Sequence, residues 1–391
     1  MRKWLPLLAI CLGSFMLILD TTVVTVAIPD IARDLTASLP AMQWVLNLYT
    51  LVLAALTLVA GSLADLVGRR RVYLVALTIF AAGSLGSGLA TSAGMLIAMR
   101  GVQGVGAAAV FATGMALLAS RYEGRDRGTA LGTLTAVLGM AAALGLLAGG
   151  LLTQFLGWRA IFLVNVPLCL VTGWLAVRCF EADAPAGRAG LDLRGVATLL
   201  RRPAFLGLLV AVAAPSLLFA APLYASVWLQ SGLGLSPVGA GLVLVPMAAV
   251  AFVTSMVVGR RLHQLPKVPL ITTALVVAAI GCGMVRVLVH DGWPGLIPGL
   301  MLMGVGIGIS GPAVSSALFD AVPAERAGLA SGVMATFRQL GQAVGVAVLG
   351  LAFVGPTGAS VGTVYLVAGA VLLASGLVVT VAHRQRRPAR V

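Results

Sequence analysis

The chain has 391 residues, of which 60% are hydrophobic and only 10% are charged, and its mean hydropathy is +1.06. A soluble globular protein could not cover its surface with so few polar side chains, so the composition excludes a soluble fold and indicates an integral membrane protein. The formal net charge of +14 is interpreted through the placement of Lys and Arg around membrane spans, and we expect no nucleic-acid partner.

Twelve apolar stretches are long enough to cross a lipid bilayer as helices, which predicts an all-α membrane protein. They fall near residues 4–28, 44–64, 72–90, 94–119, 128–153, 159–177, 204–228, 238–258, 268–289, 294–318, 327–353 and 360–382. The longest polar connection, with five Arg, divides them into two six-helix bundles, for which we expect pseudo-two-fold symmetry. The predicted domains are the bundles at 1–177 and 204–382, a cytoplasmic linker at 178–203 and a basic tail at 383–391.

Most of the 26 Lys and Arg fall in the N-terminal residues, the C-terminal tail and the loops that follow every second span. Cytoplasmic loops carry such an excess of Lys and Arg. We therefore predict a multi-pass protein of the cell membrane with both termini in the cytoplasm.

Asp20, in the first span, is the only acid deep within a predicted span. A carboxylate in hydrocarbon is costly, so we expect it to be buried in the bundle, paired or protonated, which makes it the leading candidate for a proton carrier. Arg100, in the fourth span, falls at a similar depth when residues are counted at ~1.5 Å each, so a contact with Asp20 is possible. The alternative is that the two form a structural ion pair that only locks the first bundle.

The polar loop GSLADLVGRRR, at 61–71, separates the second and third spans. Gly61 and Gly68 allow close approach of the two helices, and Asp65 places a carboxylate at the membrane boundary. We interpret Gly61, Asp65, Gly68 and Arg69 as a conformational latch at the cytoplasmic side. Arg125, in the next cytoplasmic loop, is the expected partner of Asp65.

Other polar and aromatic residues in the spans are candidates for lining a substrate cavity. Gln103 and Gln342 each follow an arginine, Arg100 or Arg338, by about one helical turn. Hydrogen bonding between helices is an equally open role for the two glutamines. Four aromatic side chains could contact an amphipathic substrate or simply pack: Phe15, Trp44, Phe111 and Tyr224.

The loop at 61–71 resembles a signature of the major facilitator superfamily. Four further stretches are similar to its drug:proton antiporter branch, which usually has fourteen spans: LDTTVVTVAIP at 19–29, RGVQGVGAA at 100–108, WRAIFLVNVP at 158–167 and RQLGQAVG at 338–345. In the fifth span, exporters of the superfamily usually have a proline where this chain has Leu146. The neighbouring Gly145, Gly149 and Gly150 are kept, and we expect them to pack helices closely.

The resemblance implies a secondary transporter, working by alternating access, that exports small amphipathic drugs or antibiotics in exchange for protons. A proton symporter or facilitator for a small metabolite is the alternative, and a non-transporting receptor or scaffold is a third reading. The sequence has no G-x-x-x-x-G-K-[ST], no H-E-x-x-H and no C-x-x-C motif. We therefore expect that the protein is not an enzyme and has no metal site and no cofactor. Its expected partners are the lipid bilayer, a small-molecule substrate and protons, and its expected functional unit is a monomer.

Overall fold

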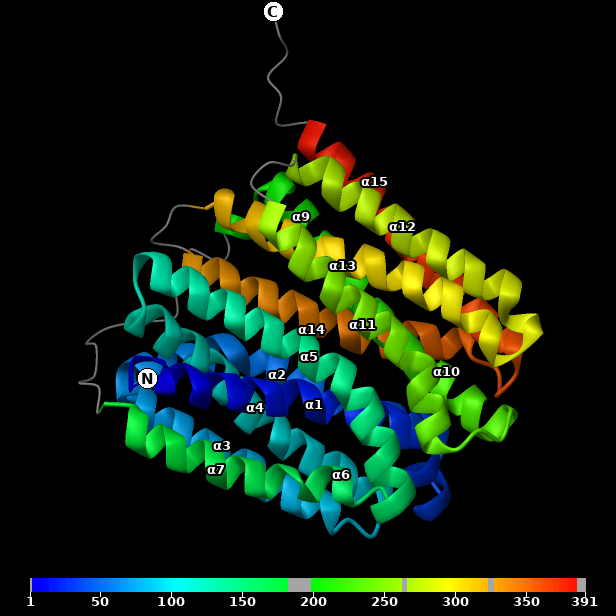
Figure 1. The fold of residues 1–391 in the computed structure, drawn as a ribbon, viewed down its shortest axis with the longest axis horizontal. Helices are drawn as coiled ribbons and strands as arrows, with labels where there is room; N and C mark the ends of the chain where they lie inside the picture. Colours follow the sequence, from blue (N-terminus) through cyan, green and yellow to red (C-terminus); the bar gives the residue numbers. More distant parts are fainter. Residues whose placement is uncertain (1, 182–197, 262–265, 323–326, 385–391) are drawn as a thin grey trace, which may run out of the picture. The chain divides into compact units, whose positions relative to one another are not determined.

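The computed structural model describes residues 2–181, 198–261, 266–322 and 327–384, and within these ranges the chain forms helices and no strands (Figure 1). The long helices of the N-terminal half are α1 (Leu5–Asp34), α2 (Leu39–Val67), α3 (Arg69–Gly88), α4 (Ala93–Arg121) and α5 (Gly124–Leu156), followed by α6 (Ala160–Leu163) and α7 (Asn165–Cys179). Later helices are α9 (Pro203–Leu218), α10 (Ala221–Val227), α11 (Pro237–Arg261), α12 (Lys267–Leu288), α13 (Leu296–Asp320), α14 (Ala327–Ala352) and α15 (Gly358–Arg384). Short elements are η1 (Arg2–Trp4), η2 (Trp228–Gly232), η4 (Val289–Asp291) and η5 (Trp293–Gly295).

Eleven helical stretches in the described ranges are long and apolar enough to cross a membrane. They overlap the predicted spans except the one at 327–353, which corresponds to α14. This helix of 26 residues is not among the eleven, and its sequence includes Arg338, Gln339 and Gln342. The all-helical membrane architecture is confirmed, while the count of twelve spans stays a prediction.

Two of the predicted spans are interrupted, and each interruption lies one turn before a proline. Pro167 has no N–H to donate to the carbonyl of Leu163, where α6 ends and α7 begins two residues later. Pro222 has the same relation to Leu218, the last residue of α9. At each break a proline removes one backbone hydrogen bond, whereas the helices that contain Pro29, Pro215, Pro246 and Pro312 continue through these residues.

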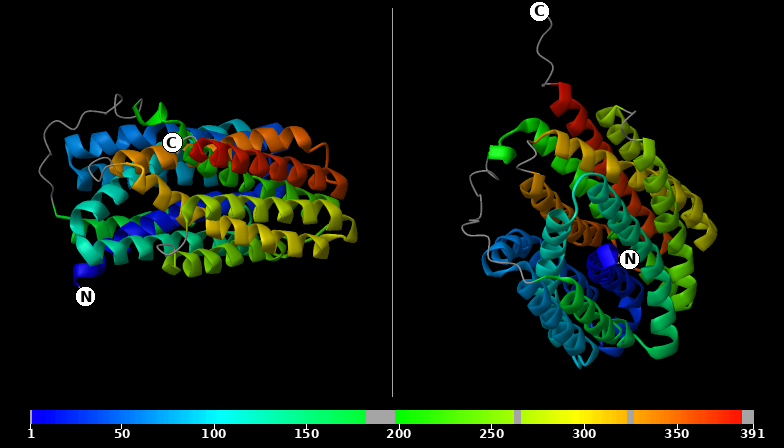
Figure 2. Two further views of the ribbon diagram at one scale, coloured as in Figure 1. Left: turned by 90° about the horizontal axis from the view of Figure 1, so that it is seen from above. Right: turned by 60° about the vertical axis from the view of Figure 1, so that its left-hand side comes forward.

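The chain separates into two compact units. The first contains Met1–Leu191 and Ser236–Val238, and the second contains Asp192–Leu235 and Gly239–Val391. Within each unit the helices run roughly alongside one another (Figure 2). The predicted domain limits, with six spans in each bundle, stay a prediction.

In the first unit, α4 packs against both α2 and α3, and α1 packs against α5 and α7. Glycines on α4 make this close packing possible. A Cβ at Gly104 would lie 2.8 Å from the carbonyl oxygen of Tyr49 on α2, and one at Gly106 would lie 2.6 Å from the backbone nitrogen of Phe80 on α3. Small residues on two faces of α4 thus bring three helices together around it.

In the second unit, α12 packs against α13 and α15, and α9 packs against α14 and α15. The contact between α14 and α9 also depends on glycine. A Cβ at Gly341 would lie 2.8 Å from the Cα of Ala213, and one at Gly345 would lie 2.5 Å from the carbonyl oxygen of Leu217. One face of α14 is therefore held against the backbone of α9.

Candidate functional site

Asp20 of α1 and Arg100 of α4 form an ion pair inside the first unit, and both side chains are 0% exposed. An Arg100 Nη1–H donates to Asp20 Oδ2. The contact that the depths of the two residues made possible is present. Because the two opposite charges lie away from water, each depends on the other for compensation.

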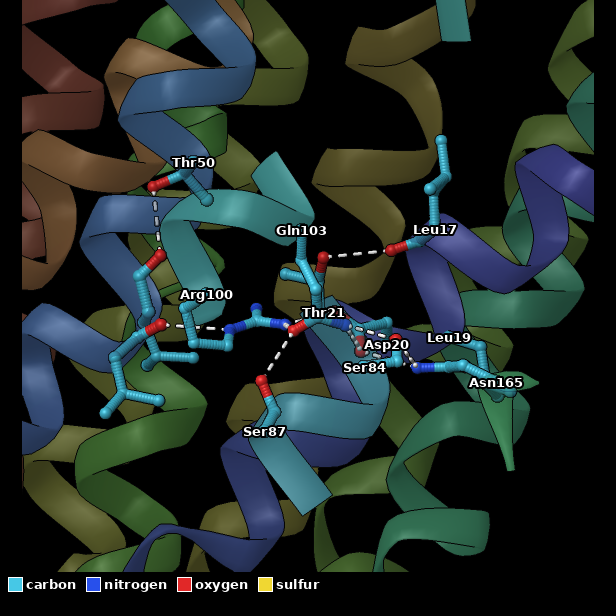
Figure 3. A network of polar contacts seen from close by, with 12 residues as sticks. Leu17, Leu19, Asp20, Thr21, Thr50, Ser84, Ser87, Arg100, Gln103 and Asn165 are labelled. Carbon is cyan, nitrogen blue, oxygen red and sulfur yellow. Dashed lines mark hydrogen bonds and ion pairs between the residues drawn. The ribbon is translucent and has the colours of Figure 1, made fainter. Parts of the chain in front are cut away.

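Two amides hold the second oxygen of the Asp20 carboxylate (Figure 3). Asp20 Oδ1 accepts hydrogen bonds from Gln103 Nε2 at 3.2 Å and from Asn165 Nδ2 at 2.8 Å. Gln103 Nε2 also donates to Ser84 Oγ at 2.7 Å, and Ser87 Oγ donates to Gln103 Oε1 at 3.2 Å. The carboxylate is thus held by donors from α4 and α7, with α3 supporting Gln103.

The guanidinium of Arg100 makes contacts beyond the ion pair. Its Nε–H donates to the carbonyl oxygen of Val45 on α2 at 3.1 Å, and an Nη1–H donates to Gln103 Oε1 at 2.9 Å. Its central carbon lies 4.2 Å from the centroid of the Tyr49 ring, in the range of a cation–π contact. Arg100 Nη2 is buried and has no hydrogen-bond partner among the described residues. The two N–H groups of this nitrogen therefore remain for a water molecule or a rearranged carboxylate.

Local structure explains how these side chains meet. Arg100 and Gln103 lie three residues apart on α4, so they share a face of the helix. A Cβ at Gly83 would lie 2.8 Å from the backbone nitrogen of Gln103, so the absence of a side chain lets α3 approach. Asn165 is the first residue of α7, at the break before Pro167, and its side chain is fully buried.

Sequence reasoning missed Asn165, Ser84 and Ser87. All three are 0% exposed. Asn165 lies within a stretch that carried the family resemblance, but no role was assigned to it. A signal was available, because an amide beside a proline in an apolar span needs a polar partner inside the protein.

The predicted latch residues lie at the α2–α3 junction. Gly68 joins the helices with φ of +108°, a value that side chains rarely allow. Asp65 accepts a hydrogen bond from Arg69 Nε at 3.0 Å, and Arg69 Nη1 donates to the carbonyl oxygen of Ala116 at 3.4 Å. The side chain of Arg125 lies outside the described residues, so its predicted contact with Asp65 stays a prediction. At Gly61, a Cβ would meet only Ala112 at 3.9 Å, so close approach does not require glycine there.

A pocket of about 290 Å³ opens beside these residues within the first unit. Its lining includes Asp65, Arg69, Arg121 and Glu181. Arg121 Nη2 lies 2.8 Å from Glu181 Oε1, and this hydrogen bond holds the pKa of Glu181 below its ordinary value. Each acid at this pocket therefore has an arginine beside it.

The other cavity candidates are dispersed. Tyr224 of the second unit is fully buried, and its hydroxyl donates to the carbonyl of Val346, which favours a packing role. In the first unit, Trp44 is 52% exposed, and Phe111 packs against the hydrophobic core. Phe15 is partly buried. Arg338 is exposed in the middle of α14, with Gln342 partly buried one turn later.

Gly145 and Gly149 of the fifth span lie where α5 meets α1, whereas a Cβ at Gly150 would lie 2.7 Å from the carbonyl oxygen of Pro237. A Cβ at Gly145 would overlap the hydroxyl of Thr22, and one at Gly149 would lie 2.8 Å from the carbonyl oxygen of Val23. The helix continues through Leu146 over 33 residues and contains no proline. The absence of side chains at Gly145 and Gly149 therefore lets α5 approach α1 closely.

The amino-acid sequence also matches known proteins. Residues 10–346 match the sequence model of the Major Facilitator Superfamily. The multidrug resistance protein Stp of Mycobacterium tuberculosis is 32% identical over 403 aligned positions, which cover 88% of this chain and 75% of that protein. The puromycin resistance protein pur8 of Streptomyces alboniger is 34% identical over 420 positions, with 92% and 83% covered.

The cephamycin export protein CmcT of Amycolatopsis lactamdurans is 34% identical over 401 positions, with 87% of this chain and 82% of that protein covered. Among solved structures, the crystal structure of a D-xylose-proton symporter shares the fold, with a TM-score of 0.78 over 95% of both chains at 15% identity. The family match over most of the chain, the relatives above 30% identity and the common fold lead to one conclusion: the chain belongs to the Major Facilitator Superfamily and is a multi-pass membrane transporter of small molecules.

Proposed function

We propose that this transporter is a proton-coupled antiporter that exports small amphipathic drugs or antibiotics from the cytoplasm by alternating access. The observation that carries the proposal is the buried Asp20–Arg100 pair, because Asp20 is the only acid deep within a predicted span. The cargo class follows the names of the relatives, which include a multidrug resistance protein, a puromycin resistance protein and a cephamycin export protein.

In the proposed mechanism, Asp20 carries the proton. While it is ionised, Arg100 balances its charge and the two amides hold its other oxygen. Protonation removes the negative charge and leaves the guanidinium with its contacts to the carbonyl of Val45 and the ring of Tyr49. The electrostatic hold between α1 and α4 then weakens, which shifts the balance between inward-facing and outward-facing states. Gln103 and Asn165 position the carboxylate for this exchange.

The arrangement in the membrane is part of the proposal. The lysines and arginines favour cytoplasmic termini and a cytoplasmic latch at Asp65 and Arg69, in a cell membrane. The two predicted bundles of six spans would provide, within a single chain, the halves that alternating access requires, so the proposed functional unit is a monomer.

The test is drug-induced proton movement in proteoliposomes that contain a pH-sensitive dye, over a panel of hydrophobic drugs and antibiotics. We expect protons to move opposite to the drug, and Asp20→Asn to abolish this movement. Asp126→Asn is the matched control, because it removes an exposed acid that pairs with Lys3 at the end of the first unit. Drug-linked proton movement that persists in Asp20→Asn would rule out Asp20 as the carrier.

A proton symporter or facilitator for a small metabolite is the second candidate. It is favoured by the uninterrupted α5, in which Leu146 stands at the position where exporters of the superfamily usually have a proline. The sign of the flux distinguishes the two candidates. Protons and substrate move in the same direction in a symporter, and a facilitator moves substrate without protons.

A further inference from the structure

We propose that Arg338 and Gln342 on α14 form a binding site for an anionic group of the substrate, a carboxylate or a comparable monoanion. The proposal deepens the proposed function and rests on it, since it names the chemical class of the exported molecule. Four observations carry it: the missing counter-ion of Arg338, its place along the helix, the face on which it lies, and the free amide one turn away.

Arg338 has no counter-ion within the described part of its unit. Between residue 192 and the C-terminus the sequence contains only four acids: Asp192, Asp291, Asp320 and Glu325. Asp320 ends α13 and pairs with Lys267, and Asp291 ends η4, while the other two lie outside the described residues. Arg338 makes no hydrogen bond or ion pair with any described residue. In this respect Arg338 differs from Arg100, whose charge is balanced by the carboxylate of Asp20.

The position of Arg338 makes this lack of a partner costly. It lies 11 residues after the first residue of α14, or about 16 Å along a helix of 26 residues. The guanidinium is therefore close to the middle of the span, where an arginine that faces lipid costs at least about 2.5 kcal/mol. Such residues face a bundle interior or a water-filled space, and the side chain of Arg338 is exposed.

The faces of α14 indicate which of these surroundings applies. The face with Gly341 and Gly345 is held against α9. A second face is apolar and exposed, as expected of a surface toward lipid: Leu340, Val344 and Leu351. At 100° per residue, Arg338 lies about 20° from Gly345 and about 160° from Leu340, so it lies on the side of the glycines, with Gln342, Ser331 and Ala335 within about 60° of it. The charge is thus separated from the apolar face and lies on a stripe of polar and small residues.

The chemistry of this stripe suits an anion. A guanidinium presents its N–H donors as a planar fork that matches the two oxygens of a carboxylate, and such charge-assisted bonds are about twice as strong as neutral ones. The amide of Gln342 makes no hydrogen bond to a described residue and supplies another donor within reach of the same ligand. A cationic group would be repelled by an arginine that no acid neutralises. The substrate itself therefore supplies the missing negative charge.

The experiment measures the local potential with thiol reagents on the full-length transporter in proteoliposomes. A reporter cysteine, Gln342→Cys, is introduced with Cys179→Ser, which removes the only native cysteine that is not buried among the four. We compare the rates of reaction with the anionic sulfonatoethyl and the cationic trimethylammonioethyl methanethiosulfonates. Adding Arg338→Gln should lower the anionic-to-cationic rate ratio by about tenfold, as expected for one charge about 6 Å away across water, with a dielectric constant of about 80. Arg286→Gln, on α12 beside His290, is the matched control and should leave the ratio unchanged.

The second measurement tests recognition with an amphipathic carboxylate, benzylpenicillin, and its uncharged methyl ester. Benzylpenicillin should slow the reaction of the reporter cysteine in the presence of Arg338, and the ester should not. The proposal would be overturned if Arg338→Gln left the rate ratio unchanged. It would also be overturned if the two compounds protected the reporter cysteine equally, or if neither protected it. Ala335→Cys, on the same face, replaces the reporter if Gln342→Cys fails to fold. Asp20→Asn should abolish proton movement and leave the rate ratio intact, so failure of the proposed function is distinguishable from failure of this site.

Discussion

Replacing Arg100 by glutamine should destabilise the protein more than replacing Arg100 and Asp20 together. Arg100→Gln leaves the carboxylate of Asp20 fully buried, with only the amides of Gln103 and Asn165 beside it. A buried charge that has lost its partner is more costly than a buried pair of neutral groups. We therefore predict that the double variant, Asp20→Asn with Arg100→Gln, is more stable than Arg100→Gln alone.

The magnitude follows from the contacts of the pair. Removing one partner of a buried ion pair costs about 3–5 kcal/mol. Arg100→Gln also removes the contact with the ring of Tyr49, which contributes about 2 kcal/mol when desolvated. In the combination of Asp20→Asn and Arg100→Gln no charge is left uncompensated, and the remaining loss is of hydrogen bonds at about 0.5–1.5 kcal/mol each. We expect the pair to be coupled by about 2 kcal/mol or more.

The assay is a double-mutant cycle on the purified protein in detergent, with the unfolding midpoint followed by tryptophan fluorescence. Lys3→Gln is the control, since the Lys3–Asp126 pair spans 2.5 Å but its side chains are 58% and 43% exposed. That change should cost no more than about 1 kcal/mol. Additive effects of Asp20→Asn and Arg100→Gln would refute the reasoning, because they would mean that the two charges are not coupled.

Two further predictions concern packing and pH. Gly106→Ala should lower the free energy of unfolding by about 1–3 kcal/mol, because the new Cβ would lie 2.6 Å from the backbone nitrogen of Phe80. The control is Gly132→Ala, which should not lower it, because nothing lies within 4 Å of a Cβ at that position. Equal decreases in the melting temperature of the two variants would contradict this account. The pKa of Glu181 is lowered by Arg121, so the stabilisation from this pair is present above the unfolded pKa of Glu181 and is lost as the pH falls through the lower folded value. Glu181→Gln should accordingly melt slightly below the unaltered protein at pH 7 and equal it in strong acid, and a difference that persists in strong acid would disprove the role of the pair.

Much of the fold could be predicted from the sequence because a bilayer imposes simple requirements. Each span needs about 20 apolar residues, and its backbone groups must be satisfied within the helix. The approximate positions of the helices followed from these requirements, and so did the similar depths of Asp20 and Arg100, which made a contact between them possible. The breaks one turn before Pro167 and Pro222 were not predicted, because other prolines in the chain, such as Pro29 and Pro312, lie inside continuous helices.

The remaining features depended on which helix faces meet, and one sequence does not specify this. Asn165 lies 145 residues after Asp20 in the sequence and contacts it because α7 begins at a helix break beside α1. The hydropathy pattern did not single out Asn165 as a functional residue. Tyr224 was a candidate for substrate contact, but its hydroxyl is held by a backbone carbonyl in the interior of its unit. The sequence by itself determined the membrane class, the approximate spans and the one deep acid, since these depend on transfer of side chains into lipid. Only the tertiary structure decided the partners of each buried polar group, because hydrogen bonds require specific distances between atoms that are remote in the chain.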